Sequence, residues 1–292
     1  MNKPSFIISA PVDTYSGYGA RARDIVKSII ELDKYDVKIL PQRWGDTPSG
    51  FLENHDKWKF LQPLCIQNLT SKPDIWMQIT IPSEFQPVGT YNIGCTAGIE
   101  STGCASPWVE GLNKMDLNLV SSEHSKKVFK DIRFEQKDKQ TNQVVNIIKL
   151  EKPIEVIFEG VDLDTYFYKK PKDVNINLDT IKESFCYLFV GHWLGGSFGH
   201  DRKNISVLVK NFFEAFKGQK SPPALILKSC IGRNSYISRE ELLQKIKVIK
   251  KSYHKDTKLP NVYIFNGNLS DEQINDLYNH PKVKSMVSFT KG

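Results

Sequence analysis

The stretch that decides the fold lies at the start of the chain, where residues 5–40 read SFIISAPVDTYSGYGARARDIVKSIIELDKYDVKIL. It opens with the apolar run Phe6–Ala10 and ends with the apolar run Val37–Leu40, and both predict strands. Between them, apolar residues recur at helical spacing, which predicts a helix with one buried face. Because a strand, a helix and a second strand follow one another, we expect a parallel sheet covered by helices.

The same alternation of apolar runs and helical patterns continues beyond this first unit. Further strands are predicted at Ile75–Ile79, Tyr91–Thr96, Leu117–Val120 and Glu155–Phe158. Helices are predicted to begin at Ser106-Pro107 and at Ser122, because serine accepts bonds from free N–H groups and proline suits the first helical position. The polar stretch 135–146 predicts a surface excursion.

A second α/β series follows a break in this pattern. Residues 168–179 are rich in Lys, Pro, Asp and Asn, which predicts a linker and divides the chain into domains 1–172 and 173–292. Strands are then predicted at Cys186–Val190, Ala224–Leu227, Val262–Phe265 and Lys284–Phe289. Helices are predicted at residues 205–216 and at two capping boxes, Ser238–Glu241 and Ser270–Gln273. The chain stops soon after the last strand, so we expect the second domain to be incomplete.

Composition and charge narrow the class of protein. Hydrophobic residues make up 40% of the chain and aromatic residues 11%, which is typical of a globular protein. The net charge of +7 is compatible with nucleic acid, an anionic membrane surface or an anionic substrate. We interpret it mainly as solvated surface, because lysines spread over loops and helix faces, for example Lys245, Lys247, Lys250 and Lys251. The absence of an RNA-binding signature argues against a nucleic-acid partner, whereas weak association with a membrane surface stays open.

The cysteines and the N-terminus indicate a cytoplasmic protein, with a position peripheral to a membrane left open. The five cysteines are odd in number and lack paired metal-ligand spacing, so we expect reduced thiols. No signal sequence or apolar span long enough to cross a bilayer is present. No metal is predicted, because the sequence has neither an Asp-x-Asp element nor a histidine pair at helical spacing.

A glycine-rich loop precedes the first predicted helix. Residues 16–22, SGYGARA, match the dinucleotide fingerprint Gly-x-Gly-x-x-Ala, but six residues separate Ala10 from Gly17 and no acidic residue ends the second strand. A nicotinamide cofactor is therefore not expected. Gly17 and Gly19 instead allow backbone N–H groups to approach a phosphate at a helix N-terminus, and the alternative is a plain turn.

Four segments, taken in order, carry a resemblance to a known family. They are Ser16–Gly19, Val120–Ser125, Phe158–Asp162 followed by Phe167, and Phe189–His192 continuing through Arg202–Asn204. Together they resemble the group 1 family of retaining nucleotide-sugar glycosyltransferases, over essentially the whole chain. The resemblance implies a GT-B-like α/β fold, in which two Rossmann-like domains with parallel sheets face each other across a cleft. The family's C-terminal motif of two glutamates does not follow, so we expect a truncated chain with little transfer activity of its own.

The resemblance also implies which residues hold the donor. Arg202 and Lys203 match the pair that binds the donor diphosphate, and Gly17 and Gly19 are expected to assist them. Negative charge develops on the departing diphosphate, so cations and a helix N-terminus stabilise that step without a metal. The alternative is two solvated cations at a helix start, where the helix dipole makes positive charge mildly unfavourable.

Five further residues are candidates for contacts with the donor. His192 stands where the family often has arginine, and Lys228 follows a predicted strand at the edge where parallel sheets bind ligands. A surface lysine is the alternative for Lys228. Phe265, Asn266 and Gly267 resemble the segment that lines the nucleobase.

One catalytic candidate lies in the first domain. Glu100 follows a strand in a segment where relatives place acceptor-side residues, so we expect it to bind the acceptor or to accept its hydroxyl proton. The alternative is a carboxylate that caps its own loop. Trp76, Trp108 and Trp193 are interpreted as core residues rather than as platforms for sugars.

The predicted function is metal-independent transfer of a hexose from a nucleotide-diphosphate sugar, with retention, to an unknown glycan, lipid or protein acceptor. The alternative is a noncatalytic protein of the same fold that binds a nucleotide sugar or a glycan.

Overall fold

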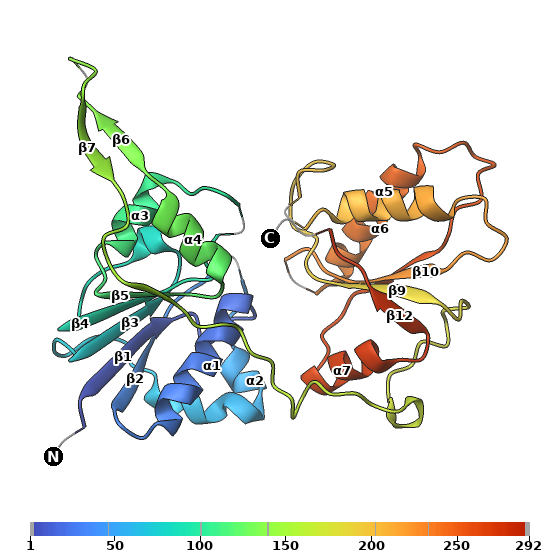
Figure 1. Cartoon of the computed structure of the whole chain (residues 1–292). Coiled ribbons are helices and arrows are strands. Elements are labelled where there is room, and N and C mark those ends of the chain that lie inside the picture. Colours follow the sequence, from blue (N-terminus) through green and yellow to red (C-terminus); the bar gives the residue numbers. More distant parts are fainter. Residues whose placement is uncertain are drawn as a thin grey trace. The chain divides into compact units, whose positions relative to one another are not determined.

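Two compact units make up the chain in the computed structural model (Figure 1). The structure describes residues 3–45, 47–99, 101–138, 140–201, 203–232 and 234–289. Unit 1 extends to Gly160, and unit 2 begins at Val161. Each unit is built around a parallel sheet, so the prediction of two Rossmann-like α/β domains is confirmed.

Unit 1 contains a six-stranded parallel sheet in the order β2-β1-β3-β4-β5-β8. Its strands are β1 (Ser5–Ala10), β2 (Asp36–Pro41), β3 (Ile75–Ile79), β4 (Tyr91–Cys95), β5 (Leu117–Val120) and β8 (Ile154–Val156). Its helices are α1 (Gly17–Glu31), α2 (Phe51–Asn54), α3 (Ser106–Leu112) and α4 (Glu123–Asp131), with 3₁₀ turns at Asp56–Leu64 and Pro82–Glu84. Ile8 packs in the α1 core and Ile7 against the core of α3 and α4, because successive side chains of a strand point to opposite faces. Helices therefore cover both faces of the sheet.

The polar excursion predicted at 135–146 is a two-stranded antiparallel hairpin of unit 1. Its strands are β6 (Phe134–Lys137) and β7 (Val144–Ile148), and they share no ladder with the six-stranded sheet. Figure 1 shows the hairpin projecting from the body of unit 1. At its turn, the Asp138 carboxylate accepts bonds from the N–H groups of Gln140 and Thr141. These bonds lower the pKa of Asp138.

Unit 2 contains a four-stranded parallel sheet in the order β11-β10-β9-β12. Its strands are β9 (Cys186–Val190), β10 (Ala224–Lys228), β11 (Val262–Phe265) and β12 (Val283–Met286). One face packs on α5 (Ile205–Phe216) and α6 (Tyr236–Lys250), and the other on α7 (Asp271–Asn279). The chain moves from β9 outward to β11 and then returns to place β12 on the other side of β9. Doubly wound sheets bind ligands at such a reversal, outside the carboxyl ends of the strands.

The units divide after Gly160, whereas the sequence placed the boundary between 172 and 173. The physical reason is a strap, residues 167–175, that is bound to α7 and so belongs to unit 2. Asn279 holds its first part, because its side chain donates to Phe167 O at 3.0 Å and accepts from Lys169 N at 2.9 Å.

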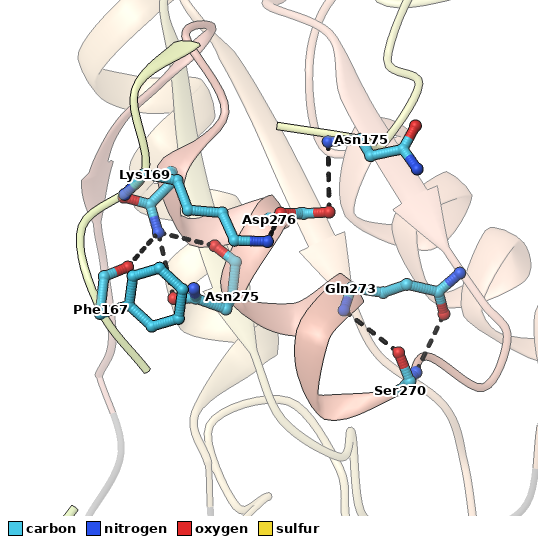
Figure 2. Close-up of polar contacts among 8 residues, drawn as sticks. Phe167, Lys169, Asn175, Ser270, Gln273, Asn275 and Asp276 are labelled. Atoms are coloured by element: carbon cyan, nitrogen blue, oxygen red, sulfur yellow. Dashed lines mark hydrogen bonds and ion pairs between the residues drawn. The ribbon is translucent and has the colours of Figure 1, made fainter. Parts of the chain in front are cut away.

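A nearly buried carboxylate holds the rest of the strap (Figure 2). Asp276 is 4% exposed, and its Oδ1 lies 2.7 Å from Lys169 Nζ. Its Oδ2 accepts a bond from Asn175 N at 3.2 Å. A charge this well covered is stable only when it is paired and hydrogen-bonded, and the strap supplies both.

The helix starts follow the predicted caps at some positions and depart from them at others. Ser122 caps α4 as predicted, since its side chain accepts from Ser125 N. The prediction for α6 is wrong: its N-cap is Ser235, and Ser238 lies inside the first turn. The pattern Ser-x-x-Glu fits Ser238–Glu241, whereas the residue three positions after Ser235 is Ser238, so the helix starts at the serine without a capping box. Helix α3 begins at Ser106, but its N-cap is Ala105, which has no side-chain bond.

The capping box of α7 is confirmed and gives a direct stability test (Figure 2). Ser270 Oγ accepts from Gln273 N at 3.2 Å, and Gln273 Oε1 accepts from Ser270 N at 2.9 Å. We expect Ser270→Ala to lower the free energy of unfolding by about 1 kcal/mol, because a helix N–H loses its acceptor. Ser270→Thr should stay within roughly 0.5 kcal/mol of the parent in the same urea titration, since threonine also caps helices. Equal loss in both variants would contradict a capping role.

Candidate functional site

The carboxyl edge of the unit 2 sheet brings together three residues predicted for the donor site. His192 follows β9, Lys203 precedes α5 and Lys228 ends β10. Desolvation lowers the pKa of His192, and the charges of Lys228 and Lys203 lower it further. His192 keeps solvent contact, and its ring is mainly neutral near pH 7 because its pKa is below the usual value. We call His192, Lys203 and Lys228 the basic cluster.

Lys228 is a partly enclosed cation of the basic cluster. It is half-buried, and desolvation lowers its pKa. Among the described residues, only the nearby Cys230 opposes this effect, and no carboxylate does. The ammonium therefore lies in a setting where an anionic ligand would be favourable.

Pairing between β9 and β10 continues past the strand ends and fixes the position of His192. Gly191 N donates to Lys228 O, and Trp193 N donates to Cys230 O, both at 3.0 Å. Trp193 is 1% exposed and packs in the core under α5 and α6, which agrees with its interpretation as a core residue. Successive side chains of an extended segment point to opposite sides, so the His192 side chain points away from this core and keeps its contact with solvent.

The start of α5 is fixed by residues that the sequence did not single out. Asp201 is 1% exposed, and its carboxylate accepts from Ile205 N at 2.7 Å and from Ser206 Oγ at 2.6 Å. Asn204 has φ of 49° and donates from its side chain to Phe289 O at 3.1 Å. Lys203 thus lies between two anchored residues, beside the segment that follows β12. Because Asp201 already occupies the amide of Ile205, side chains rather than that amide are available for an anion.

The loops after β10 and β11 are tied to each other. The Asn266 side chain donates to Ser229 O at 3.2 Å and to Ser238 Oγ at 3.4 Å. Ser238 Oγ also accepts from Ile231 N at 2.7 Å, so this serine joins the two loops to the first turn of α6. Phe265 packs against the core beneath α7, and Gly267 has open space where a side chain would stand.

The two glycines of the first loop differ in their surroundings. Gly17 has no atom within 4 Å of the position that a Cβ would take. Gly19 is buried, and a Cβ there would lie 2.5 Å from Thr14 O, so the turn needs a glycine for packing. The Gly19 N–H donates to the Ser16 cap at 2.9 Å, which gives it an acceptor within the chain. Only Gly17 is therefore open to a phosphate without rearrangement of this cap.

Glu100 and Arg202 lie outside the described residues. On the chain beside Glu100, Gly98 has φ of 92° and Ser125 Oγ bonds both N and O of Ile99. A Cβ on Gly98 would lie 2.2 Å from Ser125 Oγ, so this close approach requires glycine. Trp76 is 3% exposed and belongs to the core, in agreement with its interpretation.

The lowered pKa of His192 predicts proton uptake when a diphosphate binds. An anion beside the imidazole favours its charged form and raises its pKa, so binding should take up a proton near pH 6.5. Titration calorimetry of a nucleoside diphosphate in buffers of different ionisation enthalpy measures this uptake. Protonation of the nucleotide itself is common to both proteins, so the difference between the parent and His192→Gln isolates the residue. Equal uptake by the two proteins would show that His192 does not sense the ligand.

The described part of the chain shows neither a group of three metal-ligating side chains nor a helix long and apolar enough to cross a membrane. All five cysteines are free.

Comparisons with known proteins give structural similarity at a low level. No family model matches the chain, and no curated protein matches it. An α,α-trehalose-phosphate synthase (UDP-forming) from Burkholderia vietnamiensis is similar with a TM-score of 0.46 and 11% identity, over 95% of this chain and 75% of that one. The N-terminal domain of Candida albicans trehalose-6-phosphate phosphatase is similar with a TM-score of 0.42 and 11% identity, over 96% of this chain and 76% of that one. Similarity at this level assigns no function.

Proposed function

We propose that the chain is a glycosyltransferase that binds a nucleotide-diphosphate sugar at the carboxyl edge of the unit 2 sheet and transfers the sugar, with retention, to an acceptor bound by unit 1. The observation that carries this proposal is the basic cluster at the strand reversal of a doubly wound sheet. Ligands of such sheets bind at this place, and a diphosphate is the ligand group that three basic side chains suit best.

The chemical step needs charge neutralisation more than it needs an acid. When the bond between the sugar and the diphosphate breaks, negative charge grows on the diphosphate oxygens. Lys203 and Lys228 are point charges that stabilise it, and Arg202 next to Lys203 would grip two oxygens at once. His192 is neutral before binding and becomes a third cation when the ligand raises its pKa. In this proposal these side chains, rather than a metal of the protein, balance the charge.

The remaining candidates have supporting roles in this proposal. The loop that contains Phe265, Asn266 and Gly267 would border the nucleobase, and the open space at Gly267 supports this. Gly17 would offer its backbone to a phosphate, with Gly19 shaping the turn behind it. Glu100 is proposed to bind the acceptor or to accept its hydroxyl proton.

A panel of nucleotides tests the proposal. We expect calorimetry to show that at least one of UDP, GDP, ADP and dTDP binds about tenfold or more tightly than its own monophosphate, because the second phosphate adds charge-assisted bonds. The corresponding nucleotide sugars are then incubated with the chain and analysed for released diphosphate. Failure of every diphosphate to exceed its monophosphate would overturn the proposed donor site. Release of the diphosphate would exclude the noncatalytic alternative.

A further inference from the structure

A cavity of about 720 Å³ opens at the amino edge of the unit 2 sheet, the edge opposite the basic cluster. Its lining comes from the segments that lead into three strands, with residues 182–185 before β9, 221–223 before β10, and Lys258, Leu259 and Asn261 before β11, and from Tyr187 within β9. Phe216, the last residue of α5, completes it. The volume lies within the range of sites that hold small organic molecules.

One wall of the cavity is aromatic and apolar. The ring centroids of Phe185 and Tyr187 are 5.2 Å apart, and those of Tyr187 and Phe216 are 5.9 Å apart, with tilted planes in both pairs. Pro222 and Pro223 extend this wall. Phe185 is 43% exposed although it belongs to this cluster, so a flat apolar ring would cover surface that the fold leaves open.

The charged groups around the cavity favour an anion. The lining holds two lysines against one glutamate, Glu183, whose Oε1 accepts from Asn261 Nδ2 at 2.7 Å and whose Oε2 accepts from Tyr263 OH at 3.0 Å. Lys182 and Lys258 are exposed at the cavity. Lys258 Nζ donates to the uncharged carbonyl of Lys220 at 3.3 Å, which leaves its positive charge available.

We infer that this cavity is a second binding site, for an amphipathic organic anion made of a flat ring system and one carboxylate, sulfonate or phosphate group. The ring packs against Phe185, Tyr187 and Phe216, and the anion faces Lys182 and Lys258. The site is separate from the basic cluster, since it lies at the opposite edge of the sheet and at the opposite end of α5. It does not depend on the proposed transferase activity.

Two matched fluorescent probes test this inference on the full chain. Anilinonaphthalene sulfonate carries a ring system and an anion, and N-phenylnaphthylamine carries similar rings without the charge. We expect the sulfonate probe to bind with a stoichiometry of one, and we expect UDP and GDP not to displace it. Lys182→Gln combined with Lys258→Gln should weaken the sulfonate probe at least about tenfold, because the anion loses both charged partners, and should leave the neutral probe unchanged.

Variants of the apolar wall complete the test. Phe185→Ala should weaken both probes at least fivefold, because both lose ring contact. Tyr236→Ser, on an exposed aromatic of α6 outside the cavity, should change neither. The lysine variants affect only exposed side chains, so they decide the question even if Phe185→Ala lowers the stability of the fold. Displacement by nucleotides, several equivalent sites, or unchanged binding in the lysine variants would each overturn the inference.

Discussion

Replacing Asp276 with alanine is expected to destabilise unit 2 by about 3 kcal/mol, near the low end of the cost of breaking a buried ion pair. The carboxylate is almost fully covered, and its partner Lys169 keeps 20% of its side-chain exposure. The substitution leaves that ammonium without its counter-charge and leaves Asn175 N without its acceptor. The strap, residues 167–175, should therefore be held less tightly, and unit 2 should unfold at a lower urea concentration.

The measurement must report on unit 2 alone. Trp193 is the one tryptophan of the sequence that falls in unit 2, so its ¹⁹F signal in protein labelled with fluorotryptophan follows that unit during urea unfolding. Asp256→Ala is the control, since Asp256 is exposed and should change the free energy of unfolding by less than about 0.5 kcal/mol. A loss below about 1 kcal/mol in Asp276→Ala would show that the ion pair does not hold the strap.

Lys228→Gln is expected to weaken diphosphate binding by roughly 10- to 100-fold, because a half-buried charge-assisted contact is worth about 1.5–3 kcal/mol. The same substitution should not lower the free energy of unfolding, and it should raise it if it changes it at all. Desolvation lowers the pKa of Lys228, so the folded state binds this proton less tightly than the unfolded state does. Below both pKa values the charge costs stability, and that cost fades as the pH rises through the folded pKa. Removing the ammonium at pH 7 should leave the protein as stable as before or more stable.

Paired measurements separate these two effects. Calorimetry with the tightest nucleoside diphosphate gives the loss of affinity, and urea unfolding gives the change in stability. Lys251→Gln, an exposed lysine after α6, is the matched control and should alter neither. A variant that loses both binding and stability would indicate that Lys228 supports the fold rather than a ligand.

Apolar runs and local caps are the parts of the fold that the sequence predicts well. Buried strands such as Ile75–Ile79 and Cys186–Val190 have the predicted bounds. Strands of a parallel sheet are covered on both faces, so they stand out in the sequence as short apolar runs. The capping box of α7 is also predictable, because its two residues, Ser270 and Gln273, are only three positions apart in the sequence. The boundary between the units is not, because it depends on the bond between Lys169 and Asp276, which are 107 residues apart in the sequence.

The residues of the candidate site also fall into those that the sequence predicts and those that it does not. Lys228 is predictable because it follows a predicted strand, and the ends of parallel strands meet at one edge. His192 is a candidate through the resemblance to the glycosyltransferase family. Asp201 was missed, since nothing in its neighbourhood shows that its carboxylate turns back to Ile205. Asn204 did carry a signal, because asparagine is among the few residues other than glycine that accept a positive φ. The role of Ser238 in joining two loops depends on their path through space and has no pattern in the sequence.

Amide chemical shifts during titration with a nucleoside diphosphate test the central claim most directly. We predict that the largest ¹⁵N–¹H shifts fall at the carboxyl edge of unit 2, at Gly191, His192, Lys203, Ser229 and Asn266. Shifts concentrated at the amino edge of that sheet, or confined to unit 1, would contradict the placement of the donor at the basic cluster.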